Sequence, residues 1–145
     1  MSGASDPIDW LNRARQDVRS ARRLLIDPPE IEVAAYHVQQ AVEKAIKSYL
    51  AAEAIRYPRG GGAGHDLEAL ASLIPEADPL HVQALSLSYL TPWATAYRYP
   101  ADDPMTAEPP PARSQIEHDL LLAEAFIEAV AQRVAPVPPS RGSTP

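Results

Sequence analysis

Apolar residues recur at intervals of three and four positions along three long stretches of the chain, which is the spacing of one face of an α-helix. In residues 7–26 the apolar positions are Trp10/Leu11, Ala14, Val18, Ala21 and Leu25. In residues 31–55 they are Ala34, Val38, Ala41/Val42, Ala45/Ile46 and Tyr49. In residues 112–134 they are Ile116, Leu120, Ala123, Ile127, Val130 and Val134. Each stretch therefore predicts an amphipathic helix with one buried face.

Two further helices are expected between the second and the last of these stretches. Asp66 is a candidate N-cap for a short helix over residues 67–74. A longer helix is predicted over residues 79–97, with Pro79 at its first turn. This helix contains Pro92, which predicts a kink or an early end.

The fold class that follows is all-α: an antiparallel up-down bundle of four long helices plus one short helix. β-Branched residues are sparse and Ala and Leu are abundant, which favours helices over strands. A chain of 145 residues is expected to form one domain. We assign residues 7–134 to the bundle, and expect residues 1–6 and the Pro-rich residues 135–145 to be disordered.

Composition excludes several classes of function. The net charge of −6 gives no overall attraction to nucleic acid. Without cysteine there are no disulfides or thiolate ligands, and no His/Asp/Glu spacing is typical of a metal site, so we expect neither a metal nor a cofactor. No apolar run reaches the ~18 residues that span a bilayer. We therefore expect a cytoplasmic protein, and the usage rich in Ala, Arg and Pro suggests a bacterial one.

Positive charge is concentrated locally on the first predicted helix, where Arg15, Arg19, Arg22 and Arg23 flank the apolar stripe. One interpretation is a solvated helix face. The other is a surface that contacts an acidic partner or an RNA backbone.

Polar side chains also line one face of the second predicted helix, at His37, Gln40, Lys44 and Lys47. The two lysines are the only ones in the chain. Glu43 precedes Lys47 by four positions, an arrangement that supports a helix whether or not the line has a further role. The pattern alone allows a core helix with a solvated polar edge.

Three motifs give the chain its resemblance to a known family. They are HVQQAVEKAIKSYL at residues 37–50, His65-Asp66-Leu67, and Arg98-Tyr99-Pro100, in that order. Over residues 8–134 the chain resembles the HEPN domain family (higher eukaryotes and prokaryotes nucleotide-binding domain), in the branch often found beside minimal nucleotidyltransferases. The resemblance implies an up-down bundle, a homodimer, and a site that includes His37, Gln40, Lys44, His65 and Arg98.

Two roles are open for these residues, together with Lys47, Tyr97 and Tyr99. In the first, Lys44 and Arg98 hold phosphates while Tyr97 or Tyr99 stacks on a base. In the second, Gln40, Glu43, Lys44 and Arg98 form a buried polar network that fixes the helix register or a dimer interface.

A catalytic alternative comes from the Arg-x4–6-His motif of HEPN ribonucleases, which lies at the start of the last helix and cleaves RNA across a dimer. Arg113 and His118 match it at that place, whereas the match of Arg59 with His65 lies in a Gly-rich loop. In HEPN toxins that are nucleotidylated, a Tyr stands two positions after the His. Leu120 stands there in this chain, so nucleotidylation at that position is not expected.

The resemblance therefore implies a non-catalytic nucleotide- or substrate-binding partner of a minimal nucleotidyltransferase, in a bacterial two-component or toxin–antitoxin-type system. One alternative is a metal-free ribonuclease that uses Arg113 and His118 across a dimer. Another is a helical oligomerisation module without a ligand. The ligand would be a nucleotide or RNA, and no membrane association is expected.

Overall fold

The computed structural model describes residues 6–58, 62–96, 105 and 109–136. Three long helices are α1 (Pro7–Leu24), α2 (Ile31–Ala52) and α5 (Arg113–Val134). Shorter elements are the 3-10 helices η1 (Gly62–His65) and η2 (Ser88–Ala94) and the α-helices α3 (Leu67–Ser72) and α4 (Pro79–Leu85). The described residues contain no strand, and the all-α fold class is confirmed.

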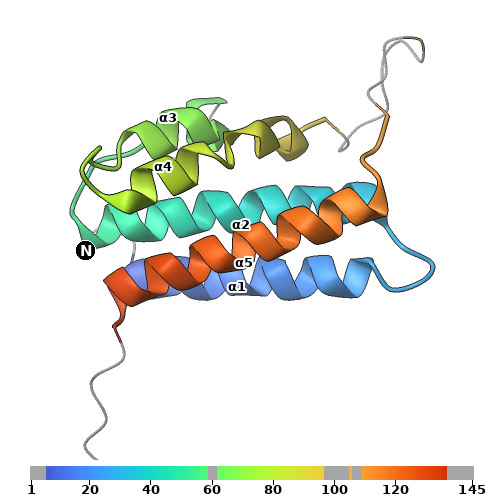
Figure 1. The fold of residues 1–145 in the computed structure, drawn as a ribbon, viewed down its shortest axis with the longest axis horizontal. Helices are drawn as coiled ribbons and strands as arrows, with labels where there is room; N and C mark the ends of the chain where they lie inside the picture. The colour runs from blue at the N-terminus through green and yellow to red at the C-terminus, as the bar shows by residue number, and fades with distance from the viewer. Residues whose placement is uncertain (1–5, 59–61, 97–104, 106–108, 137–145) are drawn as a thin grey trace, which may run out of the picture.

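The three long helices lie side by side along the long axis of the molecule (Figure 1). α1 runs in the opposite direction to α2 and α5. α3, α4 and η2 form a shorter layer on the other side of α2. Because α2 packs against α1, α5, α3 and η2, it is the central helix of the bundle.

Aspartate caps set the starts of three helices. The Asp6 carboxylate accepts a hydrogen bond from the Ile8 amide at 2.9 Å. Asp66 accepts from the Ala69 amide at 3.2 Å, which confirms it as the N-cap of α3. Asp78 accepts from the Leu80 amide at 3.0 Å. Each bond satisfies an amide that a helix leaves unpaired at its first turn.

The expected helix over residues 79–97 is instead two short elements, α4 and η2, so the described part of the bundle has three long helices rather than the four expected. Pro92 lies inside η2. It has no amide hydrogen to donate, and its ring obstructs the preceding turn of an α-helix. The α-helix ends before Pro92, because α4 already stops at Leu85.

The core is formed by the predicted apolar faces of the three long helices. Val38, Val42 and Ile46 of α2 are completely buried. Val18 of α1 and Ile127 of α5 are buried among the core residues. Phe126, the largest of the completely buried side chains, was not in the predicted stripe of the last helix. No helix among the described residues is long and apolar enough to cross a membrane.

Candidate functional site

A buried ion pair lies at the centre of the polar face of α2. Lys47 Nζ is 2.9 Å from Glu43 Oε2, and each side chain is only 4% exposed. The ammonium also lies 5.5 Å from the centroid of the Trp10 ring, within cation–π range. Of the predicted ligand-binding residues, Lys47 is therefore enclosed and already neutralised.

The second carboxylate oxygen of Glu43 gathers three polar side chains. It accepts from Gln39 Nε2 at 3.1 Å and from Gln40 Nε2 at 3.3 Å. His65 Nδ1 lies 3.0 Å from the same oxygen. Gln40 also donates to Gln39 Oε1 at 2.7 Å. The structure thus joins three predicted residues, Gln40, Lys47 and His65, through Glu43.

His65 connects this network to the surface, because its side chain is 45% exposed. It lies at the end of η1, just before α3. An ionised carboxylate can only accept hydrogen bonds, so Nδ1 carries the proton that points to Glu43. The other ring nitrogen, Nε2, has no partner among the described residues.

A second carboxylate, Asp17 of α1, binds the two remaining residues of the predicted polar line, His37 and Lys44. Asp17 Oδ1 is 2.7 Å from His37 Nδ1, and Oδ2 is 2.7 Å from Lys44 Nζ. The side chains of His37 and Lys44 are 26% and 23% exposed. Residues seven apart lie almost above one another on a helix, so His37 and Lys44 turn together to α1.

Arg113 and His118 have separate surroundings on α5. Arg113 Nη1 is 2.8 Å from Asp27 Oδ1, in the connection between α1 and α2. His118 is exposed and has no partner among the described residues. Five positions correspond to a rotation of about 140°, so the two side chains leave the helix in different directions. Within one chain they form no common site.

Comparison with known proteins places the chain in a family. The model of the HEPN domain matches residues 8–134, nearly the whole helical part. The chain belongs to the HEPN family. A crystal structure of an archaeal HEPN homologue has the same fold, with a TM-score of 0.65 and 22% sequence identity. The alignment covers 90% of this chain and 98% of the archaeal one. No curated protein matches the chain.

Part of the site predicted for this HEPN domain lies outside the described residues. Tyr97, Arg98 and Tyr99 belong to that part. The described wall of the site is therefore α2 with His65. Within it, no three His, Asp or Glu side chains are placed to hold a metal ion, and the same is true of all the described residues.

Two buried carboxylates of the HEPN domain were missed by sequence reasoning. Asp119 is completely buried, accepts from Gln115 Nε2 at 2.9 Å, and accepts from the Tyr89 hydroxyl. Burial and this carboxylate raise the pKa of Tyr89. A signal was present, because Asp119 stands three positions after Ile116 and so falls in the apolar stripe. Asp17 likewise stands three positions after Ala14, in the apolar stripe of α1.

A third carboxylate, Asp78, joins three helices of the HEPN bundle. Its Oδ2 accepts from the Tyr49 hydroxyl at 2.6 Å, and its Oδ1 accepts from Arg133 Nη2 at 2.9 Å. Burial and Asp78 raise the pKa of Tyr49 to about 12. Burial alone would raise the pKa of Asp78, but the hydrogen bonds from Arg133, Tyr49 and the Leu80 amide lower it.

Proposed function

We propose that this HEPN protein is a non-catalytic nucleotide-binding module. It would act as a homodimer beside a minimal nucleotidyltransferase, in a bacterial two-component or toxin–antitoxin-type system. The nucleotidyltransferase and the homodimer are proposed from the family resemblance of the sequence motifs. The observation that supports ligand binding is the half-exposed His65, held at Nδ1 by the buried Glu43 network.

The hydrogen bond to Glu43 orients the His65 ring so that Nε2 is the nitrogen left for a ligand. With the proton on Nδ1, a neutral ring presents a lone pair at Nε2. Such a nitrogen accepts a hydrogen bond from a ribose hydroxyl or from an amino group of a base. The phosphates would then be held by other cations, of which Lys44 is partly exposed and Arg98 lies outside the described residues.

The rest of the polar network serves to orient His65. Glu43 is held by Lys47 on one oxygen and by two amides on the other, so its position is fixed. A side chain whose own partners are fixed is better oriented for a ligand, which lowers the entropy lost on binding. The polar face of α2 therefore combines the two roles that its sequence left open.

Titration calorimetry with ATP tests this proposal. The His65→Ala variant should bind ATP about tenfold more weakly, equivalent to ~1.4 kcal/mol, while the folded bundle is retained. His81→Ala is the matched control, because His81 is also partly buried, and its Nδ1 bonds the Ile74 carbonyl rather than the network. Absence of ATP binding by the unaltered protein, or equal binding by His65→Ala, would contradict the proposal.

Two more substitutions separate the binding role from the structural role. Lys44→Ala should weaken ATP binding and leave the melting temperature nearly unchanged if Lys44 meets the phosphates. A large loss of melting temperature would instead show that its ion pair with Asp17 is structural. Arg98→Ala is tested in the same way: weaker ATP binding at an unchanged melting temperature would support phosphate contact, and a large loss of melting temperature would indicate a structural role.

A second candidate function is metal-free RNA cleavage by Arg113 and His118 across a dimer. The observation that favours it is the exposed His118, which has no partner among the described residues and lies near the start of α5. Cleavage without divalent metal that is lost in His118→Ala would establish it. The remaining alternative, an oligomerisation module without a ligand, would show neither ATP binding nor cleavage.

A further inference from the structure

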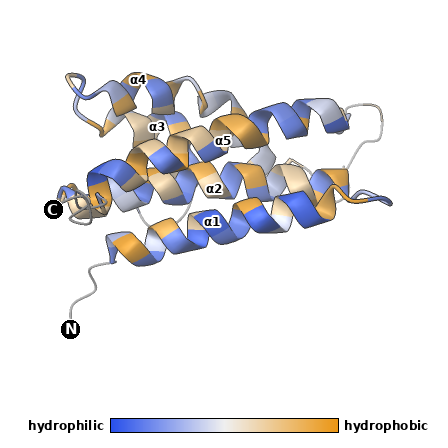
Figure 2. Cartoon of the chain, turned by 60° about the horizontal axis from the view of Figure 1, so that its bottom comes forward, coloured by the Kyte–Doolittle hydropathy of each residue, from blue (hydrophilic) through white to orange (hydrophobic). Residues whose placement is uncertain are grey.

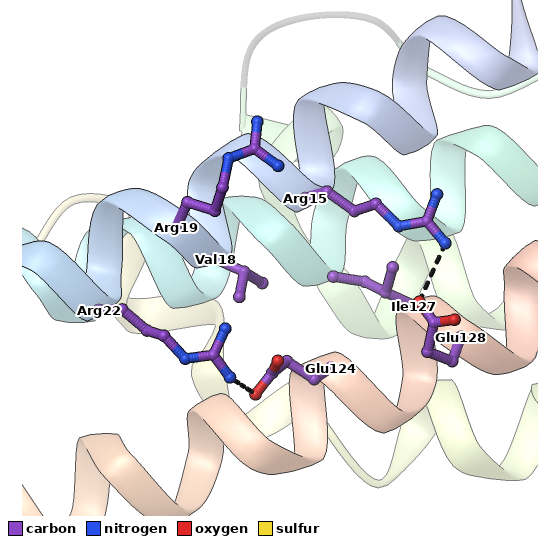
Figure 3. Close-up of a pocket in the computed structure, with 7 residues that line it drawn as sticks. All are labelled: Arg15, Val18, Arg19, Arg22, Glu124, Ile127 and Glu128. Carbon is purple, nitrogen blue, oxygen red and sulfur yellow. Dashed lines mark hydrogen bonds and ion pairs between the residues drawn. The ribbon is translucent and has the colours of Figure 1, made fainter.

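A groove runs between α1 and α5, and His65 does not line it. One part is a cavity of about 220 Å³ whose floor is Val18 and Ile127 (Figure 3). A second cavity of about 380 Å³ adjoins it and shares Arg22 and Glu124. The two cavities therefore form one continuous groove, which follows the line of contact between the two helices.

Apolar surface is exposed at one end of this groove. Ile26 is 67% exposed and Leu121 is 65% exposed, and both line the second cavity. Hydrophobic and hydrophilic residues alternate along the ribbons of α1 and α5 (Figure 2). These two aliphatic side chains, beside a concave apolar floor, are surface that a neighbouring protein would bury favourably.

The charges along the groove are divided between its two rims. The α1 rim carries Arg15, Arg19 and Arg22, and the α5 rim carries Glu124 and Glu128 (Figure 3). Arg15 pairs with Glu128 at 2.9 Å and Arg22 pairs with Glu124, both within the chain. Arg19 has no partner among the described residues, so its charge is available to a neighbouring molecule.

We propose that a second copy of this chain covers the groove, about a two-fold axis parallel to it. Such an axis places α1 of each copy over α5 of the other. The basic rim then faces the acidic rim, and Arg19 of each copy lies opposite Glu124 and Glu128 of its partner. A two-fold axis across the groove would instead set α1 against α1, with arginine facing arginine. Charge complementarity therefore selects the first arrangement.

This inference gives the proposed homodimer a contact surface, and so rests on that part of the proposed function. Nucleotide binding at His65 is independent of it, because His65 does not line the groove. A variant that becomes monomeric yet still binds ATP would support both. A dimer that binds no ATP would contradict the binding role alone.

Sedimentation velocity over a range of concentrations tests the apolar part of the surface. Leu121→Asp should raise the dimer dissociation constant by at least about tenfold. Val82→Asp is the matched control: Val82 is 68% exposed but lies on α4, away from the groove. A monomeric parent protein, or equal effects of the two substitutions, would overturn the proposal.

Charge reversal tests the two-fold arrangement itself. Arg19→Glu alone and Glu128→Arg alone should each weaken the homodimer, because each sets like charges against one another. A mixture of the two proteins should form a heterodimer, because both symmetric contacts then join opposite charges. Native mass spectrometry distinguishes the three possible dimers. The control is Arg56→Glu, an exposed residue after α2 that should have no effect. Failure of the mixture to dimerise would overturn the arrangement.

Discussion

Two carboxylates of this bundle are each held between a lysine and a histidine, yet their surroundings differ. Glu43 lies between Lys47 and His65, and Asp17 lies between Lys44 and His37. In the first group the ion pair is closed to water and only the histidine reaches the surface. In the second, both partners of the carboxylate are about a quarter exposed. The same chemical groups therefore differ in how readily water can replace a lost partner.

The difference follows from where each carboxylate stands on its helix. Glu43 and Lys47 are one turn apart on α2, the central helix, and Trp10 lies beside the ammonium. Asp17 belongs to α1, whose polar edge meets α2 at the margin of the bundle. A buried ion left without its partner is far more costly than one that can be rehydrated.

The largest effect is expected for Glu43→Ala, which would strand the buried Lys47. The free energy of unfolding should fall by about 3–5 kcal/mol, as measured by urea denaturation. Replacing both members of the pair, as in Glu43→Met with Lys47→Met, should cost much less, because no charge is then left unpaired. If the double variant were the less stable of the two, the pair would not be acting as a coupled unit.

A smaller effect is expected for Asp17→Asn. His37 and Lys44 can both turn to water, so the loss should be about 1–2 kcal/mol in the same urea measurement. The comparison between the two carboxylates predicts this order. A loss for Asp17→Asn as large as that for Glu43→Ala would mean that partial exposure gives no protection.

Asp78, the carboxylate held by Tyr49 and Arg133, extends the comparison to acid pH. Hydrogen bonds outweigh burial and lower the pKa of Asp78 in the folded protein. Its contribution to stability is therefore complete above the unfolded pKa of about 3.9 and is lost as the pH falls through the lower folded value. Asp78→Asn should remove this part of the pH dependence, measured by urea denaturation at a series of acid pH values. An unchanged pH profile would contradict it.

Tyr49, which donates to Asp78, contributes to the pH dependence of stability at the alkaline end. The pKa of Tyr49 is raised from 10.0 to about 12, so its contribution to stability is complete below the unfolded pKa and lost as the pH rises through the folded one. Ultraviolet titration of tyrosinate should show a late-ionising tyrosine that disappears in Tyr49→Phe. Tyr89 has the pKa raised in the same direction and serves as an internal comparison through Tyr89→Phe.

The smallest effect is expected for Arg113→Ala. Arg113 and Asp27 form an exposed pair at 2.8 Å, and exposed pairs contribute about 0–1 kcal/mol. Thermal unfolding should therefore change little. A large loss would show that this pair fixes the connection between α1 and α2, and would add a fourth carboxylate to the comparison.

Much of the fold was predictable because a helix is encoded by residues that are close together in the sequence. The spacing of Val38, Val42 and Ile46 is enough to identify α2 and its buried face. The caps at Asp6 and Asp66 are equally local, since each side chain bonds an amide two or three positions away. The split of the fourth helix was less clear, because Pro92 marks a break without fixing where the α-helix ends.

The polar site was only half predictable. The sequence placed Glu43 one turn before Lys47 and grouped it with Gln40 in one of two possible roles. It did not identify Glu43 as the acceptor for His65, or Asp17 as the partner of Lys44. Those pairings depend on which helix faces come together, and that is decided by packing around the whole core. The sequence by itself thus determined an all-α HEPN bundle and a polar face on α2. Only the tertiary structure decided that the Glu43–Lys47 pair is enclosed and that His65 links it to the surface, because the partner of a side chain and its access to water are properties of the assembled helices.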